Sequence, residues 1–123
     1  MQFGLSREQQ MLQKAVREFA DKQIAPYADQ WDADCYLPVN EAIKPMAQLG
    51  FVGTVIPEAY GGEDAGWMAA AIITEEIARA SSSLRVQINL IGIGCAYPIY
   101  LYGTEAAKKN YVPKLCAGEM LGT

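Results

Sequence analysis

A run of 19 residues without a charged side chain, from Val86 to Thr104, is the feature that most limits how this chain can fold. Apolar residues recur along it and just before it at helical spacing, in two stripes. The stripes comprise Leu84, Ile88, Ile91, Cys95 and Ile99, and Val86, Leu90, Ile93 and Tyr97. A helix that is apolar on nearly all sides is a buried helix. The run is long enough to suggest a membrane span. However, Gln87, Asn89 and Pro98 interrupt it, so we expect a core helix and no membrane span.

A third line along the same helix has a different chemistry. Arg85, Asn89, Gly92 and Ala96 follow one another at steps of three and four, so they share one face. This face carries a guanidinium, an amide and two small residues that permit close approach. We interpret it as the floor of a pocket that the other helices hold in place.

Composition excludes several classes of function. A chain of 123 residues suits one domain, and 51% hydrophobic with 20% charged residues is typical of a globular protein. The net charge of −4 with no basic run argues against nucleic acid as a partner. The chain lacks histidine, and its three cysteines have no metal-binding spacing, so we expect reduced thiols and neither a metal site nor a catalytic cysteine.

Local signals predict an all-α fold of five to six helices, arranged as an orthogonal bundle, and no confident strand. Ser6 and Gln9 form a capping box that starts the first helix, and Pro26 ends it near Gln23 or Ala25. A proline and two glycines predict a loop over residues 53–62. The remaining helices are expected over Tyr27–Asp34, Val39–Leu49 with a kink at Pro45, Gly66–Ala80, Leu84–Gly103 with a bend at Pro98, and Glu105–Cys116.

Several short motifs, taken in order along the chain, point to a family. They are Leu5–Gln9 (LSREQ), Ile56–Gly62 (IPEAYGG), Glu75–Arg79 (EEIAR) with the serine run after it, Pro98–Gly103, and Tyr111–Glu119 (YVPKLCAGE). Each is weak alone, but together they resemble the N-terminal helical domain of acyl-CoA dehydrogenases over all 123 residues. The second motif resembles the family's "PEEYGG" loop, and the last resembles its "Y-x-P-x-L-x-x-G-E" ending.

The resemblance implies that residues 1–123 form the first domain of a longer flavin-dependent enzyme. The family's middle β-domain and C-terminal helical domain are absent, and with them the catalytic glutamate and most FAD contacts. We therefore expect no catalytic residue in this chain, and a role in shaping the acyl pocket. The family also implies an acyl-CoA substrate, an electron-transfer flavoprotein as electron acceptor, a homotetramer, and a bacterial cytoplasm or mitochondrial matrix, since no targeting segment is visible at the N-terminus.

Arg85 carries the most specific implication. Within the family, an arginine at the start of this helix is a feature of the glutaryl-CoA dehydrogenase type, where it binds the remote carboxylate of the acyl chain. By this resemblance Arg85, Val86, Asn89 and Leu90 are the expected substrate-binding residues. A guanidinium also suits a carboxylate geometrically, although spacing alone would favour a solvent-exposed arginine in a first helical turn.

Two departures bear on the reaction. Decarboxylating members carry a serine where Val86 stands and a glutamate where Ala78 stands. Both changes remove polar groups near the substrate carboxylate, which favours a non-decarboxylating glutaryl-CoA dehydrogenase. A relative that acts on benzylsuccinyl-CoA or cyclohexanecarboxyl-CoA also fits.

A second hypothesis remains open, in which the chain is a helical interaction module without flavin or chemistry of its own. Tyr97, Tyr100 and Tyr102 favour packing over an adenine platform, because aromatic residues at helical spacing usually pack. In either case we expect the isolated chain to expose apolar surface and to self-associate.

Overall fold

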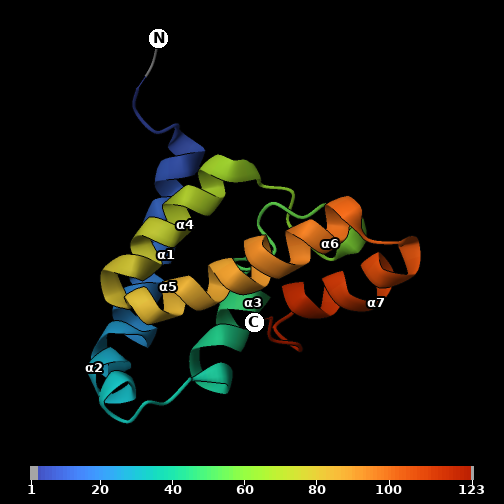
Figure 1. The fold of residues 1–123 in the computed structure, drawn as a ribbon. Helices are drawn as coiled ribbons and strands as arrows, with labels where there is room; N and C mark the ends of the chain where they lie inside the picture. Colours follow the sequence, from blue (N-terminus) through green and yellow to red (C-terminus); the bar gives the residue numbers. More distant parts are fainter. Residues whose placement is uncertain (1–2, 123) are drawn as a thin grey trace.

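A computed structural model describes residues 3–122, which fold into helices joined by short connections, with no strand in that range (Figure 1). The elements are α1 (Arg7–Gln23), α2 (Ala25–Ala33), the π-helix η1 (Val39–Ile43), α3 (Lys44–Gln48), the 3₁₀-helix η2 (Glu58–Tyr60), α4 (Gly66–Ala80), α5 (Ser82–Asn89), the π-helix η3 (Leu90–Ala96), α6 (Tyr97–Tyr102) and α7 (Glu105–Cys116). Since η1 runs into α3, and α5 runs through η3 into α6, the described range has six continuous helical segments besides the short 3₁₀-helix η2. The predicted all-α class is confirmed.

Helices α1 and α4 lie side by side and form one half of the bundle (Figure 1). Helix α1 begins with the predicted capping box, in which Ser6 and Gln9 each satisfy a backbone N–H of the other. Val16 and Ala20 of α1 and Ile73 and Ile77 of α4 are buried in the common core. The predicted ends of both helices are confirmed.

The long helical segment α5–η3–α6 runs across the α1–α4 pair in Figure 1. Ser81 caps it, since its hydroxyl accepts the backbone N–H of Leu84. Pro98 lies in the first turn of α6, directly after the π-helical stretch. A proline has no N–H to donate into a helix, and the wider π turn is where this helix accommodates it. Gly103 ends the segment, as predicted.

A second π turn also precedes a proline. Pro45 lies in the first turn of α3, directly after η1, so the kink predicted there is a change of helix type. Gly50 follows with a φ of +81°, in the left-handed region that favours glycine after a helix end.

Helix α7 packs against η3 and α6 and closes the bundle on the right in Figure 1. Thr104 caps it by accepting the backbone N–H of Ala107, and it keeps Pro113 within its last turns. None of the helices in residues 3–122 is long and apolar enough to cross a membrane.

Candidate functional site

Arg85 lies in the first turn of α5 and is partly buried. Its Nη2 donates a hydrogen bond of 3.2 Å to the hydroxyl of Ser82. Within residues 3–122, no carboxylate lies close enough to form an ion pair with it. The guanidinium therefore has donors to spare, and a carboxylate that approached α5 would find no competing anion.

Val86 and Leu90 flank this line of the helix and present apolar side chains. Val86 is 42% exposed and Leu90 is partly buried. They lie one helical turn apart, Val86 in α5 and Leu90 at the start of η3. Such a strip suits the methylene groups of an acyl chain.

Asn89, the last residue of α5, is held by the neighbouring helix. Its Oδ1 accepts a hydrogen bond of 3.0 Å from the hydroxyl of Thr74 in α4. Both residues line a small hollow of about 10 Å³ between α4, α5 and the segment 51–55. The structure thus brings Asn89 close to Thr74, which the sequence did not single out.

The interpretation of Gly92 and Ala96 as a pocket floor is wrong. Ala96 is fully buried, and a Cβ placed on Gly92 would lie 2.1 Å from the carbonyl oxygen of Val52. The close approach that these small residues permit is made by the protein's own loop. The candidate substrate face is thus confined to the α5 end of the helix, from Arg85 to Leu90.

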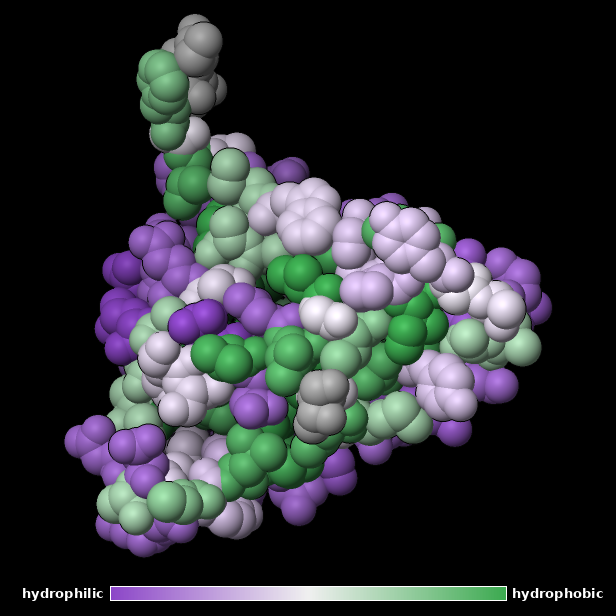
Figure 2. Space-filling view, in the orientation of Figure 1, coloured by the Kyte–Doolittle hydropathy of each residue, from purple (hydrophilic) through white to green (hydrophobic). Residues whose placement is uncertain are grey.

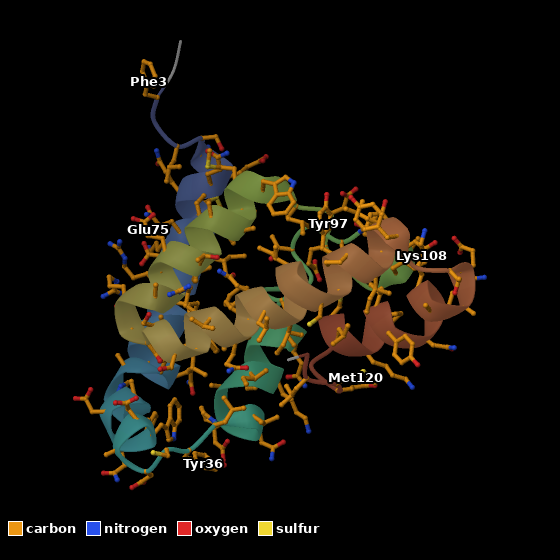
Figure 3. All side chains as sticks on the ribbon, in the orientation of Figure 1. Phe3, Tyr36, Glu75, Tyr97, Lys108 and Met120 are labelled. Carbon is orange, nitrogen blue, oxygen red and sulfur yellow. The ribbon has the colours of Figure 1, made fainter. Side chains whose placement is uncertain are left out.

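A wider hollow lies elsewhere, at the junction of α2 with the start of α5. It has a volume of about 470 Å³ and is lined on one side by Trp31 and Tyr36 and on the other by the serine run 81–83. Asp29 and Asp32 also line it, and no lysine or arginine does. Tyr36 lies in the connection that follows α2 (Figure 3).

This groove does not fit FAD. The pyrophosphate of FAD requires cationic or N–H donors, whereas the charged side chains of the groove are carboxylates. The other hollow, near Asn89, is far too small. Neither of these two hollows could hold FAD by itself.

The structure contains an ion pair between a buried glutamate and a half-exposed arginine that sequence reasoning missed. Glu76 of α4 is 1% exposed, and its carboxylate accepts two hydrogen bonds from Arg17 of α1, at 2.9 and 2.8 Å. Arg79 adds a longer contact of 3.4 Å and also pairs with Asp21 at 2.6 Å. Hydrogen bonding from Arg17 holds the pKa of Glu76 below its ordinary value, against the opposing effect of burial.

A signal for this pair was present in the sequence. Glu76 falls on the buried stripe of its helix between Ile73 and Ile77, where an acid needs a partner. Its neighbour Glu75 lies on the outer side of α4 (Figure 3). The partner Arg17 is 59 residues away, so only the fold could identify it.

The three cysteines are free thiols, and Cys116 is the buried one. Burial raises the pKa of the Cys116 thiol to about 11, which keeps it protonated and inert. Residues 3–122 contain no cluster of acidic, cysteine or histidine side chains that could hold a metal ion. Tyr97 packs edge-on against Trp67 with ring centroids 5.1 Å apart, near the start of α4 (Figure 3), which agrees with a packing role.

Comparison with known proteins gives a consistent result. The family model described as "Acyl-CoA dehydrogenase, N-terminal domain" matches residues 6–119. The chain is 62% identical to a glutaryl-CoA dehydrogenase of Desulfococcus multivorans, over 99% of this chain and 32% of that protein. It therefore spans about a third of the length of this curated relative.

Solved structures agree. One described as a glutaryl-coenzyme A dehydrogenase in complex with glutaryl-CoA matches with a TM-score of 0.94 and 62% identity, over 99% of this chain and 31% of that one. A second, described as an electron transferring flavoprotein of Acidaminococcus fermentans, matches with a TM-score of 0.90 and 30% identity, over 98% and 32%. With the family model covering nearly the whole chain, this protein belongs to the acyl-CoA dehydrogenase family, through that family's N-terminal domain.

Proposed function

We propose that residues 1–123 are the first domain of a flavin-dependent acyl-CoA dehydrogenase that oxidises an acyl-CoA bearing a second carboxylate, with glutaryl-CoA as the substrate to test first. The relative at 62% identity is named for this activity. A substrate with a ring in its acyl chain, such as benzylsuccinyl-CoA or cyclohexanecarboxyl-CoA, is the alternative within the same reaction class.

The observation that carries the substrate proposal is the unpaired guanidinium of Arg85. It is partly buried beside the apolar strip of Val86 and Leu90, and no carboxylate of the described chain neutralises it. A partly desolvated cation is costly unless an anion meets it. The remote carboxylate of the acyl chain would be that anion, with its methylenes along the strip.

In the proposed division of labour, this domain binds and orients the acyl chain and helps to exclude water. FAD, bound mainly by other domains, would accept the hydride in the complete enzyme. The base that removes the proton next to the thioester would also come from outside this chain. Val86 and Ala78 offer no hydrogen bond near Arg85, so we propose that the enzyme retains the carboxylate of its product.

The test is a substitution of Arg85 by alanine in the full-length protein that carries this chain. We expect kcat/KM for glutaryl-CoA to fall, and the fall to correspond to a loss of about 2–5 kcal/mol in transition-state stabilisation, because a desolvated charge pair is lost. The value for butyryl-CoA, which has no remote carboxylate, should change little. Equal losses on the two substrates would contradict the role of Arg85.

The role of the domain can be tested separately by exchange. A chimera in which this chain replaces the matching segment of the Desulfococcus multivorans enzyme should bind flavin and oxidise glutaryl-CoA, with the parent enzyme as control. A full-length protein without flavin absorbance would instead favour a helical interaction module.

The proposal extends to partners. The complete enzyme would form a homotetramer and pass its electrons to an electron-transfer flavoprotein. A solved structure that this chain matches carries the name of that flavoprotein in its description. Reduction of added electron-transfer flavoprotein by the enzyme and glutaryl-CoA would test it.

A further inference from the structure

The contact between Thr74 and Asn89 lies one helical turn along α5 from Arg85. It joins two helices, since Thr74 belongs to α4 and Asn89 is the last residue of α5. The hydroxyl of Thr74 donates to Oδ1 of Asn89 at 3.0 Å, and the contact is partly buried. It therefore fixes which end of the amide is engaged by the protein.

An asparagine side chain has one acceptor oxygen and an NH₂ group with two donors. With Oδ1 engaged by Thr74, the free end of Asn89 is the NH₂ group, for which no protein acceptor exists in residues 3–122. The hollow beside it, of about 10 Å³, has room for about one water molecule. The NH₂ group is therefore free to donate to water or to a partner from outside the chain.

Arg85, like the free end of Asn89, offers only hydrogen-bond donors, because a guanidinium donates hydrogen bonds and accepts none. One of its donors is used on Ser82. Residues i and i+4 of a helix lie on one face, about 6 Å apart. Arg85 and Asn89 thus line one face of α5 with donors only.

We propose that Thr74 is a positioning residue for substrate selection: by holding Oδ1 of Asn89, it turns the amide NH₂ toward the acyl site, so that Asn89 and Arg85 together offer donors to the oxygen atoms of a dicarboxylic acyl chain. This inference rests on the proposed function. It adds the NH₂ group of Asn89 to the site as a second donor. It also gives a role in the site to Thr74, which lies on a different helix.

The arrangement selects against acyl chains that end in a methyl group. A site built to hydrogen-bond a polar group discriminates strongly against an analogue that lacks it, because the donors of the site then remain unpaired. A free amide could rotate to offer its oxygen, which would repel a carboxylate. In the observed contact the hydroxyl of Thr74 donates to Oδ1, which leaves the NH₂ group as the free end of the amide.

The first experiment substitutes Thr74 by valine, which has nearly the same shape but no hydroxyl, with Thr74→Ser as the matched control. In the full-length, flavin-loaded enzyme, the measured quantity is the ratio of kcat/KM for glutaryl-CoA to that for butyryl-CoA. We expect valine to lower this ratio about tenfold, the value of one lost hydrogen bond near 1.4 kcal/mol. Serine should restore it.

A purely structural role for Thr74 predicts a different outcome. The melting temperature would then fall with valine and both substrates would lose activity in parallel, which would leave the ratio unchanged. That result overturns the inference, whether or not serine restores stability.

A second experiment substitutes Asn89 by aspartate, which keeps an acceptor for Thr74 and replaces the NH₂ group by a carboxylate oxygen. We expect the glutaryl-to-butyryl ratio to fall further than with Thr74→Val, by about a hundredfold, because like charges then meet. An unchanged ratio would show that the amide does not face the substrate.

The Arg85→Ala enzyme distinguishes a failure of the proposed function from a failure of the role assigned to Thr74 and Asn89. If Arg85→Ala lowers the ratio and the Thr74 and Asn89 variants do not, the function stands and the inference fails. If the parent enzyme shows no preference for glutaryl-CoA, the proposed function itself fails.

Discussion

At the scale of single residues, Gly92 shows what a sequence pattern can and cannot specify. Its place on a line with Ala96 correctly predicted a close approach to the helix. The pattern could not tell which atoms approach, and the structure places the carbonyl oxygen of Val52 there. A backbone contact made across 40 positions of chain leaves no periodic signal, so a ligand and a loop are indistinguishable at this stage.

This packing gives a sharp prediction for Gly92→Ala. The new Cβ would lie 2.1 Å from the Val52 carbonyl oxygen, which belongs to the backbone and cannot turn aside. We expect a loss of about 1–3 kcal/mol in the free energy of unfolding, the usual cost of overpacking. Urea unfolding of the chain at low concentration measures it.

The control for Gly92→Ala is Gly94→Ala, two residues along the same π-helix. Gly94 is exposed, and the nearest neighbour of its added Cβ would be the flexible end of Leu90, at 3.1 Å, with the Asn89 carbonyl oxygen at an ordinary contact distance of 3.8 Å. Alanine is favoured over glycine in helices by about 1 kcal/mol, so this variant should be neutral or more stable. Equal losses at the two sites would contradict the close approach of Val52.

At the scale of elements, helix ends were predictable and helix type was not. The capping box at Ser6, the serine run before α5 and Gly103 are local signals that act within one turn, and the structure confirms them. The π turns before Pro45 and Pro98 were expected only as kinks. A proline in the sequence predicts that one backbone hydrogen bond of the helix is missing. The packing around the proline determines how the helix adjusts.

The joint between α1 and α4 yields a prediction about pH. The pKa of Glu76 is lowered in the folded chain by hydrogen bonds from Arg17. The unfolded state therefore binds protons first, and the stabilisation from this pair is present above the unfolded value near 4.5. It is lost as the pH falls through the lower, folded pKa.

Glu76→Gln tests this linkage. At pH 7 we expect the variant to be less stable by about 1–3 kcal/mol, since it loses charged hydrogen bonds in a buried setting. The difference from the original chain should shrink on acidification and vanish below the folded pKa. Glu75→Gln changes the net charge equally on the outer side of α4 and should show neither effect in urea unfolding across the pH range.

At the scale of the whole molecule, the family and the domain were recognisable because short motifs occur in the right order over the entire chain. The candidate site was only partly predictable. The line through Arg85 and Asn89 followed from helical spacing, but Thr74 and Arg17 act from other helices. Pairings between helices depend on how those helices cross, which no single stretch of sequence encodes.

The apolar front of the molecule leads to a prediction about association. Apolar residues gather in the middle of the face drawn in Figure 2. Exposed apolar side chains of α4, α5 and α6 are Trp67 (53%), Met68 (55%), Val86 (42%), Leu101 (43%) and Tyr102 (86%). Exposed apolar surface of this kind favours association. In the isolated chain, we therefore expect oligomers whose fraction rises with protein concentration, as measured by sedimentation velocity.

The double variant Leu101→Lys with Tyr102→Lys should shift the isolated chain toward monomer, because two charges would be buried on association. Phe3 supplies the control, since it is 91% exposed but lies at the far N-terminal tip, away from α6 (Figure 3). Phe3→Lys should leave the oligomers in place. A chain that stays monomeric at every concentration, or that both substitutions affect equally, would show that the apolar front does not drive association.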